Sequence, residues 1–137
     1  MNKPLHYLAT PYTLYPWGLT QAFTDACVLQ NRLRTQHNLR VYSPIAHSHN
    51  LSRATGVDPK DHKFWMACCR PWMEISDVLL IAKMDGWKQS KGIYEEGQFF
   101  ALLGKPILYL DCETLAFAID AGDQLDVAIA CAIVGMK

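Results

Sequence analysis

The chain has 137 residues, half of them hydrophobic, which suffices for one domain whose apolar core needs no metal or disulfide. Thirteen basic and thirteen acidic residues cancel, so no broad field favours a nucleic-acid polymer or an anionic membrane surface. No apolar run approaches the roughly 20 residues of a membrane span. We therefore predict a single domain over residues 1–137 that holds any anionic ligand by local contacts.

Cysteine usage indicates a reducing compartment. The five cysteines are an odd number without CxxC spacing, and the chain begins at Met1 with no charged and then apolar leader. We interpret the chain as cytoplasmic, with reduced thiols. Cys68 and Cys69 are adjacent on a predicted helix, about 100° apart around its axis, so they suit small buried hydrophobes better than joint metal ligands.

The first half of the chain predicts two short strands around one helix. Residues 5–9 form an apolar strand, and residues 17–36 show apolar side chains at helical spacing with polar residues opposite. Residues 39–42 predict a second strand, which Pro44 ends. Residues 43–60 are polar and rich in turn formers, and they predict a long loop of the kind that often carries function.

The second half repeats this alternation. A helix is expected to begin at Asp58 and Pro59, with Pro71 kinking or splitting it near Arg70. The apolar run 78–82 predicts a central strand, a helix follows from Ser90, and residues 107–110 form another strand. In the tail, residues 113–121 look helical, and residues 125–134 fit either a helix or a last strand.

Strands that alternate with helices predict an α/β fold with a parallel sheet of four or five strands and helices on both faces. Ligands in such sheets bind at the carboxyl ends of the strands. Here those ends are residues 9–12, residues 43–49, residues 84–90 and Asp111.

Glu96 is the strongest candidate for chemistry. In a helix that opens near Ser90 it shares an arc with Ile93 and Phe100, whereas Glu95 projects to the other side. A carboxylate on an apolar arc is either a partly buried acid paired with a lysine or a backbone amide, or a group facing a cleft near a helix N-terminus. The second interpretation suits a nucleophile, because the helix dipole favours its negative charge.

Residues 85–92 offer weaker signals. Asp85 follows the central strand and is either a turn residue or a cleft acid, and Trp87 beside it belongs to the core or stacks on a base. Ser90 and Gly92 form a helix start that is an ordinary N-cap or an anion site. The chain has no GxGxxG or Walker loop, which removes the usual support for dinucleotide binding or nucleotide hydrolysis.

His47 and His49 form an HxH pair after a strand, with Asp61 and His62 further on, and this pattern raises a metal hypothesis. The large barrel that usually displays such a strand-end pair does not fit in 137 residues. Histidines of the surface or of a substrate loop are therefore the preferred interpretation, with no metal or other cofactor.

The chain resembles the nucleoside 2-deoxyribosyltransferase superfamily, together with its nucleotide N-glycosidase relatives and an uncharacterised bacterial and phage branch. The similar segments are YLATPYT at residues 7–13, SDVLLIAKMDGW at residues 76–87, and SKGIYEE at residues 90–96 followed by GKPI at residues 104–107. The resemblance implies a flavodoxin-like (Rossmann-like) three-layer sandwich that cleaves the bond between a base and its (deoxy)ribose.

The resemblance also implies roles for individual residues. The family's glycine four positions before its nucleophilic glutamate falls on Gly92, which makes Glu96 the nucleophile. Tyr7 would orient Glu96, Asp85 would assist departure of the base, and Ser90 would bind the sugar-phosphate end. The remaining residues expected to contact substrate come from the strand ends and the long loop, and they are Ala9, Thr10, Pro11, His47, Trp87 and Gly92. ATPYT replaces a more glycine-rich or arginine-bearing turn.

These features predict a retaining double displacement on a nucleoside or nucleoside monophosphate, completed by water in an N-glycosidase or by a second base in a transferase. One alternative is a non-catalytic nucleotide-binding or sensing domain of the same fold. Another is a metal hydrolase built on His47, His49 and Asp61. The resemblance implies a homodimer or larger homo-oligomer, and the apolar segment 125–134 offers a surface for it.

Overall fold

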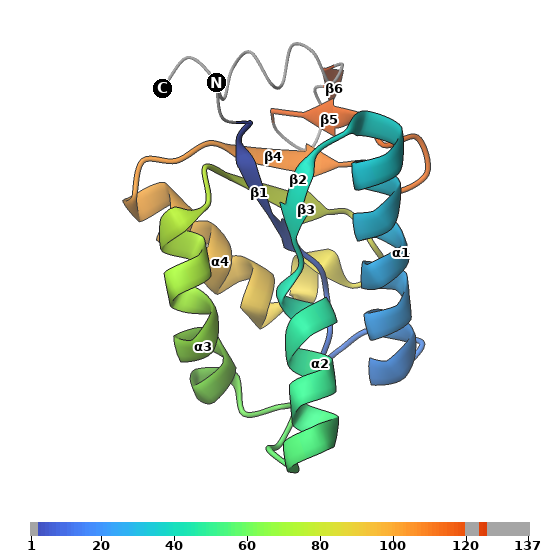
Figure 1. The fold of residues 1–137 in the computed structure, drawn as a ribbon, viewed down its shortest axis with the longest axis vertical. Coiled ribbons are helices and arrows are strands. Elements are labelled where there is room, and N and C mark those ends of the chain that lie inside the picture. The colour runs from blue at the N-terminus through green and yellow to red at the C-terminus, as the bar shows by residue number, and fades with distance from the viewer. Residues whose placement is uncertain (1–2, 120–123, 126–137) are drawn as a thin grey trace.

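The protein is an α/β sandwich built on one mostly parallel sheet (Figure 1). The structure is a computed structural model that describes residues 3–119 and 124–125. The sheet has the strand order β2-β1-β3-β4-β5-β6. Its parallel part consists of β1 (Leu5–Ala9), β2 (Arg40–Tyr42), β3 (Val78–Ala82) and β4 (Ile107–Leu110), and the short antiparallel strands β5 (Phe117–Ala118) and β6 (Gln124–Leu125) extend it.

Helices cover both faces of the sheet, so the predicted flavodoxin-like three-layer fold is confirmed. Because successive strand residues face opposite sides, Leu8 and Leu80 pack toward α1 (Leu19–His37) in one apolar cluster. Tyr7 and Leu79 belong to the opposite cluster, which they share with residues of α3 (His62–Ile75) and α4 (Lys91–Leu102). All five residues of β3 are buried, as expected for the central strand.

The prediction of a long loop at residues 43–60 is wrong, because most of this segment forms the helix α2 (Pro44–Thr55). Ser43 caps the helix by accepting a hydrogen bond from the amide of Ala46, and proline follows at the first helical position. Gly56 ends the helix in the left-handed conformation, at φ 79°. These start and stop signals define a helix although its composition is polar.

Helix α3 begins later than predicted and does not split. Its N-cap is Asp61, whose side chain accepts a hydrogen bond from the amide of Phe64. The helix then runs without interruption through Pro71, which is exposed, while Cys69 and Met73 on either side of it are buried against the sheet. Packing of these neighbours holds the helix together even though proline removes one backbone hydrogen bond.

The predicted helix at residues 113–121 is also wrong. Asp111 accepts hydrogen bonds from the amides of Glu113 and Thr114, which resembles a helix start, but Leu115 adopts a positive φ of 61° and ends the turn. The chain then enters β5, which pairs with β4. The apolar segment 125–134 lies outside the described residues except for Leu125, which belongs to β6.

The strand order places a change of direction between β1 and β3. The chain leaves β1 through α1 toward β2 on one side, and it leaves β3 through α4 toward β4 on the other. Connections that diverge in this way open a crevice beyond the carboxyl ends of the two strands, which is where open α/β sheets bind ligands.

Candidate functional site

A cavity of about 380 Å³ lies at this crevice. Its walls come from the segment after β1, the first turns of α2 and α3, the connection before α3, and the start of α4. The lining residues are Thr10, Tyr12, Thr13, Leu14, Pro44, Ile45, Ser48, Pro59, Lys60, His62, Trp65, Met66, Cys69, Ser90, Lys91, Gly92 and Glu96. The cavity is within the range of small-molecule sites, and its wall is largely apolar with a few polar groups.

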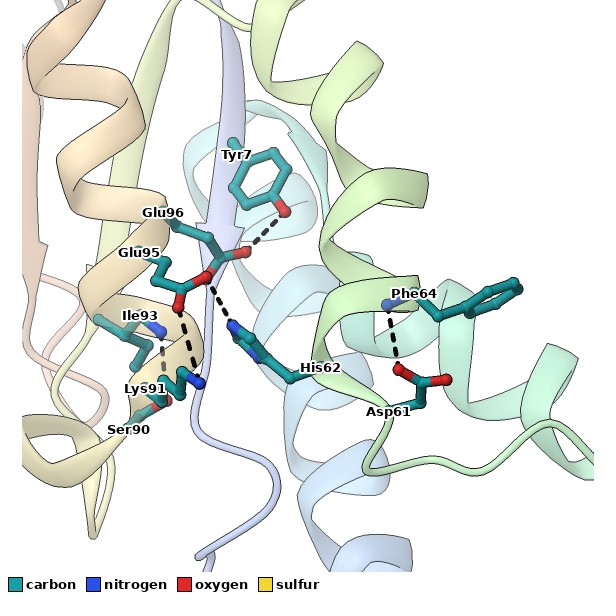
Figure 2. A network of polar contacts seen from close by, with 9 residues as sticks. All are labelled: Tyr7, Asp61, His62, Phe64, Ser90, Lys91, Ile93, Glu95 and Glu96. Atoms are coloured by element: carbon teal, nitrogen blue, oxygen red, sulfur yellow. Dashed lines mark hydrogen bonds and ion pairs between the residues drawn. The ribbon is translucent and has the colours of Figure 1, made fainter.

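Glu96 supplies the buried acid of this cavity. Ser90 caps α4 by accepting a hydrogen bond from the amide of Ile93 at 3.2 Å, and this fixes the start of the helix. Six residues after the cap, Glu96 faces the sheet with only 6% of its surface exposed. The hydroxyl of Tyr7, on β1, donates a hydrogen bond to Glu96 Oε2 at 2.6 Å (Figure 2).

Burial changes the protonation of Glu96. Loss of solvation raises the pKa of its carboxyl from 4.5 to about 8, even though the Tyr7 hydrogen bond lowers the pKa, and the nearby charge of Glu95 raises it further. The pKa of Tyr7 is raised well above 10, chiefly by burial and by the charge of Glu96. At pH 7, Glu96 is therefore mostly a neutral acid that accepts the tyrosine hydrogen bond.

Glu95 points toward the start of α3. Its Oε2 lies 2.7 Å from Nε2 of His62, and its Oε1 lies 4.0 Å from Nζ of Lys91 (Figure 2). Consecutive residues of a helix are rotated by about 100°, so the two adjacent carboxyls meet different partners. His62 lines the cavity, and its bond to Glu95 joins the start of α3 to the first turns of α4.

Two hydroxyl-bearing residues after β1 extend the polar part of the cavity. Thr10 is only 5% exposed, and its Oγ1 has no hydrogen-bond partner among the described residues. The hydroxyl oxygen of Tyr12 lies 2.7 Å from Nδ1 of His49. The His49 ring stacks on the Phe23 ring, with centroids 4.5 Å apart. The buried Thr10 hydroxyl thus retains a hydrogen bond to make with a ligand.

Several residues expected at the site lie outside the cavity wall. Asp85 is exposed, and Gly86 after it adopts a φ of 85° that turns the chain into the short 3₁₀ helix η1 (Trp87–Gln89). Trp87 packs edge-on against Tyr109, with ring centroids 5.7 Å apart. His47 is exposed on α2, and its ring lies 6.3 Å from that of Tyr42. Asp85, which was expected to assist departure of the base, therefore does not line the cavity with Glu96.

The other expected residues are near the cavity. Thr10, Ser90, Gly92 and Glu96 line it, and Tyr7 reaches it through Glu96. Ala9 and Pro11 are buried on either side of Thr10 without lining the cavity themselves.

The histidines do not gather into a metal site. Within residues 3–119 and 124–125, no three His, Cys, Asp or Glu side chains are arranged to hold a metal ion. His49 meets Tyr12, His62 meets Glu95, and Asp61 caps α3. The four described cysteines form no disulfide. The metal hydrolase hypothesis therefore has no support in the described part of the chain.

Part of the cavity wall was not predicted from the sequence, including Lys60, Trp65 and Cys69. Trp65 and Cys69 lie four residues apart on one face of α3, and that spacing indicates only an apolar stripe. His62 was considered only as a metal ligand, although its position immediately after the Asp61 cap places it at the start of a helix. The fold brings this helix start against α4.

Fold and cavity together define an α/β protein with a buried carboxyl at the carboxyl ends of its parallel strands. The chain belongs to the family described as domain of unknown function (DUF1937), whose model matches residues 5–111. The matched range contains β1 to β4 and every residue that lines the cavity. No curated protein matches the chain. None of the described helices is long and apolar enough to cross a membrane.

Proposed function

We propose that this protein cleaves or transfers the N-glycosidic bond of a (deoxy)nucleoside or nucleoside monophosphate through a covalent glycosyl intermediate on Glu96. The observation that carries this proposal is the Glu96 carboxyl, which is buried at the cavity wall and held by the Tyr7 hydroxyl at 2.6 Å. The resemblance of residues 7–13 and 90–96 to nucleoside 2-deoxyribosyltransferases supports the same assignment of the two residues.

The reaction follows from a fixed carboxylate beside a largely apolar cavity. In the first step an oxygen of ionised Glu96 attacks the anomeric carbon, the bond to the base breaks, and the base leaves with a proton. Water then attacks the glycosyl ester and releases the sugar with retained configuration. A second base in place of water gives the transferase reaction. Tyr7 keeps one carboxyl oxygen in place throughout.

The raised pKa of Glu96 sets a pH dependence for this reaction. With a pKa of about 8, roughly one tenth of the free protein carries the ionised nucleophile at pH 7. The second-order rate constant kcat/KM, which reports the free protein, should therefore rise with pH and level off above about pH 8.

A panel of nucleosides, deoxynucleosides and their 5′-monophosphates tests the proposal, with free base measured by chromatography. We expect base release by the wild type, its loss in Glu96→Gln, and unchanged release in the matched control Glu74→Gln, since Glu74 is exposed on α3. Mass spectrometry of quenched wild-type protein should show a glycosyl adduct on the peptide that contains Glu96. No release by the wild type from any substrate would refute the proposal, as would full activity of Glu96→Gln.

A second candidate function is non-catalytic binding of the same ligands, and it is favoured by the neutral state of Glu96 near pH 7. A protonated carboxyl both donates and accepts hydrogen bonds, which suits recognition of a base or a sugar hydroxyl. This function predicts that a nucleoside or nucleotide raises Tm while no base is released at any pH. Base release that rises through pH 8 would exclude it.

A further inference from the structure

Departure of the base requires a proton donor, and this inference therefore rests on the proposed function. Nucleobases are poor leaving groups as anions, so a group that protonates the base in the transition state accelerates the first step. Asp85, the residue expected to assist, is exposed and does not line the cavity. Among the described residues, the ionisable groups that do line it are Tyr12, Lys60, His62, Cys69, Lys91 and Glu96.

Most of these groups are unsuited to donate a proton near neutral pH. Burial raises the pKa of Tyr12 above its usual 10 and that of Cys69 to about 11, and lysine ammonium groups release protons only at similarly high pH. Glu96 is committed to the anomeric carbon. Histidine is the side chain that ordinarily exchanges protons near neutral pH. That leaves His62.

The geometry around His62 is that of an oriented imidazole. The residue opens α3, whose N-cap Asp61 fixes the helix start, and its ring reaches across to α4 (Figure 2). Nε2 lies 2.7 Å from Oε2 of Glu95, whose carboxylate holds the ring orientation. Nδ1 has no hydrogen bond to any described residue, so it remains for a ligand.

The charged groups around the ring come from each segment packed against it. Glu95 contacts it from α4 and lies 4.0 Å from Lys91, Lys60 and Asp61 precede it in the chain, and Glu96 and Cys69 lie in the wall of the same cavity. Glu95 is the charged group in direct contact with the ring.

We propose that His62 is the general acid and base of this cavity and that Glu95 is its positioning residue. In the first step Nδ1–H of the imidazolium gives its proton to the base as the bond between sugar and base breaks and Glu96 bonds to the anomeric carbon. In the second step neutral Nδ1 takes a proton from the attacking water, and the electron pair of the ester bond returns to Glu96. Both residues end in their starting protonation states.

Leaving-group chemistry tests this role. A 4-nitrophenyl 2-deoxyriboside releases a phenolate that needs no proton, whereas the best natural substrate from the nucleoside panel needs one. We expect His62→Asn to slow release of the natural base about 100-fold or more, and to change release of nitrophenolate less than about threefold. Glu95→Gln should give the same selective loss to a smaller extent. The control Lys63→Gln removes an exposed positive charge from the same turn of α3 and should change neither rate.

Equal losses on both substrates, or no loss on either, would overturn the role of His62 and leave Glu96 catalysis standing. A wild type that releases no base at all would overturn both proposals.

Discussion

Glu96→Gln should stabilise the fold, and the size of the gain should depend on pH. The substitution keeps an oxygen to accept the Tyr7 hydrogen bond and removes the ionisable group that burial penalises. In the wild type the folded pKa, about 8, lies above the ordinary value of 4.5. Between these values the unfolded chain has lost the proton that the folded chain still holds. The contribution of Glu96 to wild-type stability therefore falls as pH rises from about 4.5 to about 8 and is constant on either side.

The pKa difference sets the magnitude. Each pKa unit corresponds to about 1.4 kcal/mol, so the span from 4.5 to about 8 corresponds to roughly 5 kcal/mol of unfolding free energy. The gain of Glu96→Gln over the wild type should be below about 1 kcal/mol at pH 5, on the order of 3 kcal/mol at pH 7, and largest at pH 9. The Glu96 carboxyl is completely buried, so solvent screening reduces these free-energy differences little.

Urea unfolding at pH 5, 7 and 9 measures this difference directly, with the midpoint and slope fitted at each pH. The control Glu74→Gln changes an exposed glutamate of α3 and should parallel the wild type at all three values. If the unfolding free energies of Glu96→Gln and the wild type stay parallel from pH 5 to pH 9, the raised pKa of Glu96 is refuted. This result does not depend on any catalytic activity.

Two further substitutions test other parts of the structure. Thr10→Val removes a buried hydroxyl that makes no hydrogen bond to any described residue. Urea unfolding should therefore show a rise of about 1 kcal/mol in the free energy of unfolding. In the base-release assay, the same substitution should raise KM for any nucleoside substrate. Lys105→Met should lower unfolding free energy by about 2 kcal/mol, because the Lys105 ammonium donates to the carbonyls of Met73, Glu74 and Ser76 at the end of α3.

Controls separate these effects from general damage. Lys63→Met removes an exposed lysine from the same helix that Lys105 caps, and its urea midpoint should stay at the wild-type value. An unchanged midpoint for Lys105→Met would contradict the capping role. A Thr10→Ser variant keeps the hydroxyl and should keep the wild-type KM. An equal rise of KM in Thr10→Ser and Thr10→Val would contradict ligand contact through Oγ1.

Local periodicity explains why the buried face of Glu96 and the strands at residues 78–82 and 107–110 could be predicted. Glu96 repeats the helical spacing of Ile93 and Phe100, and all three are buried in α4. Helix α2 was missed because composition outweighed its cap signals, Ser43 with Pro44 at one end and Gly56 at the other. A polar segment becomes helical here because its ends are capped and one side packs on α1.

Turn geometry limits what sequence can say about the site. Asp85 follows a strand that was predicted correctly, yet the left-handed Gly86 and the 3₁₀ helix after it decide where its side chain points. Likewise, the contact between His62 and Glu95 joins residues 33 apart in the chain. Such a contact depends on how α3 and α4 pack, which no local pattern encodes.

Strand β2 has a consequence for how copies of this chain associate. It is the edge strand at one end of the sheet. An exposed strand edge is a template for pairing with another chain. Here that edge is only three residues long, begins with exposed Arg40, and is followed after Ser43 by Pro44, which has no amide hydrogen to donate. Sheet extension through β2 is thus disfavoured, which protects the protein against edge-to-edge aggregation and directs any self-assembly to other surfaces.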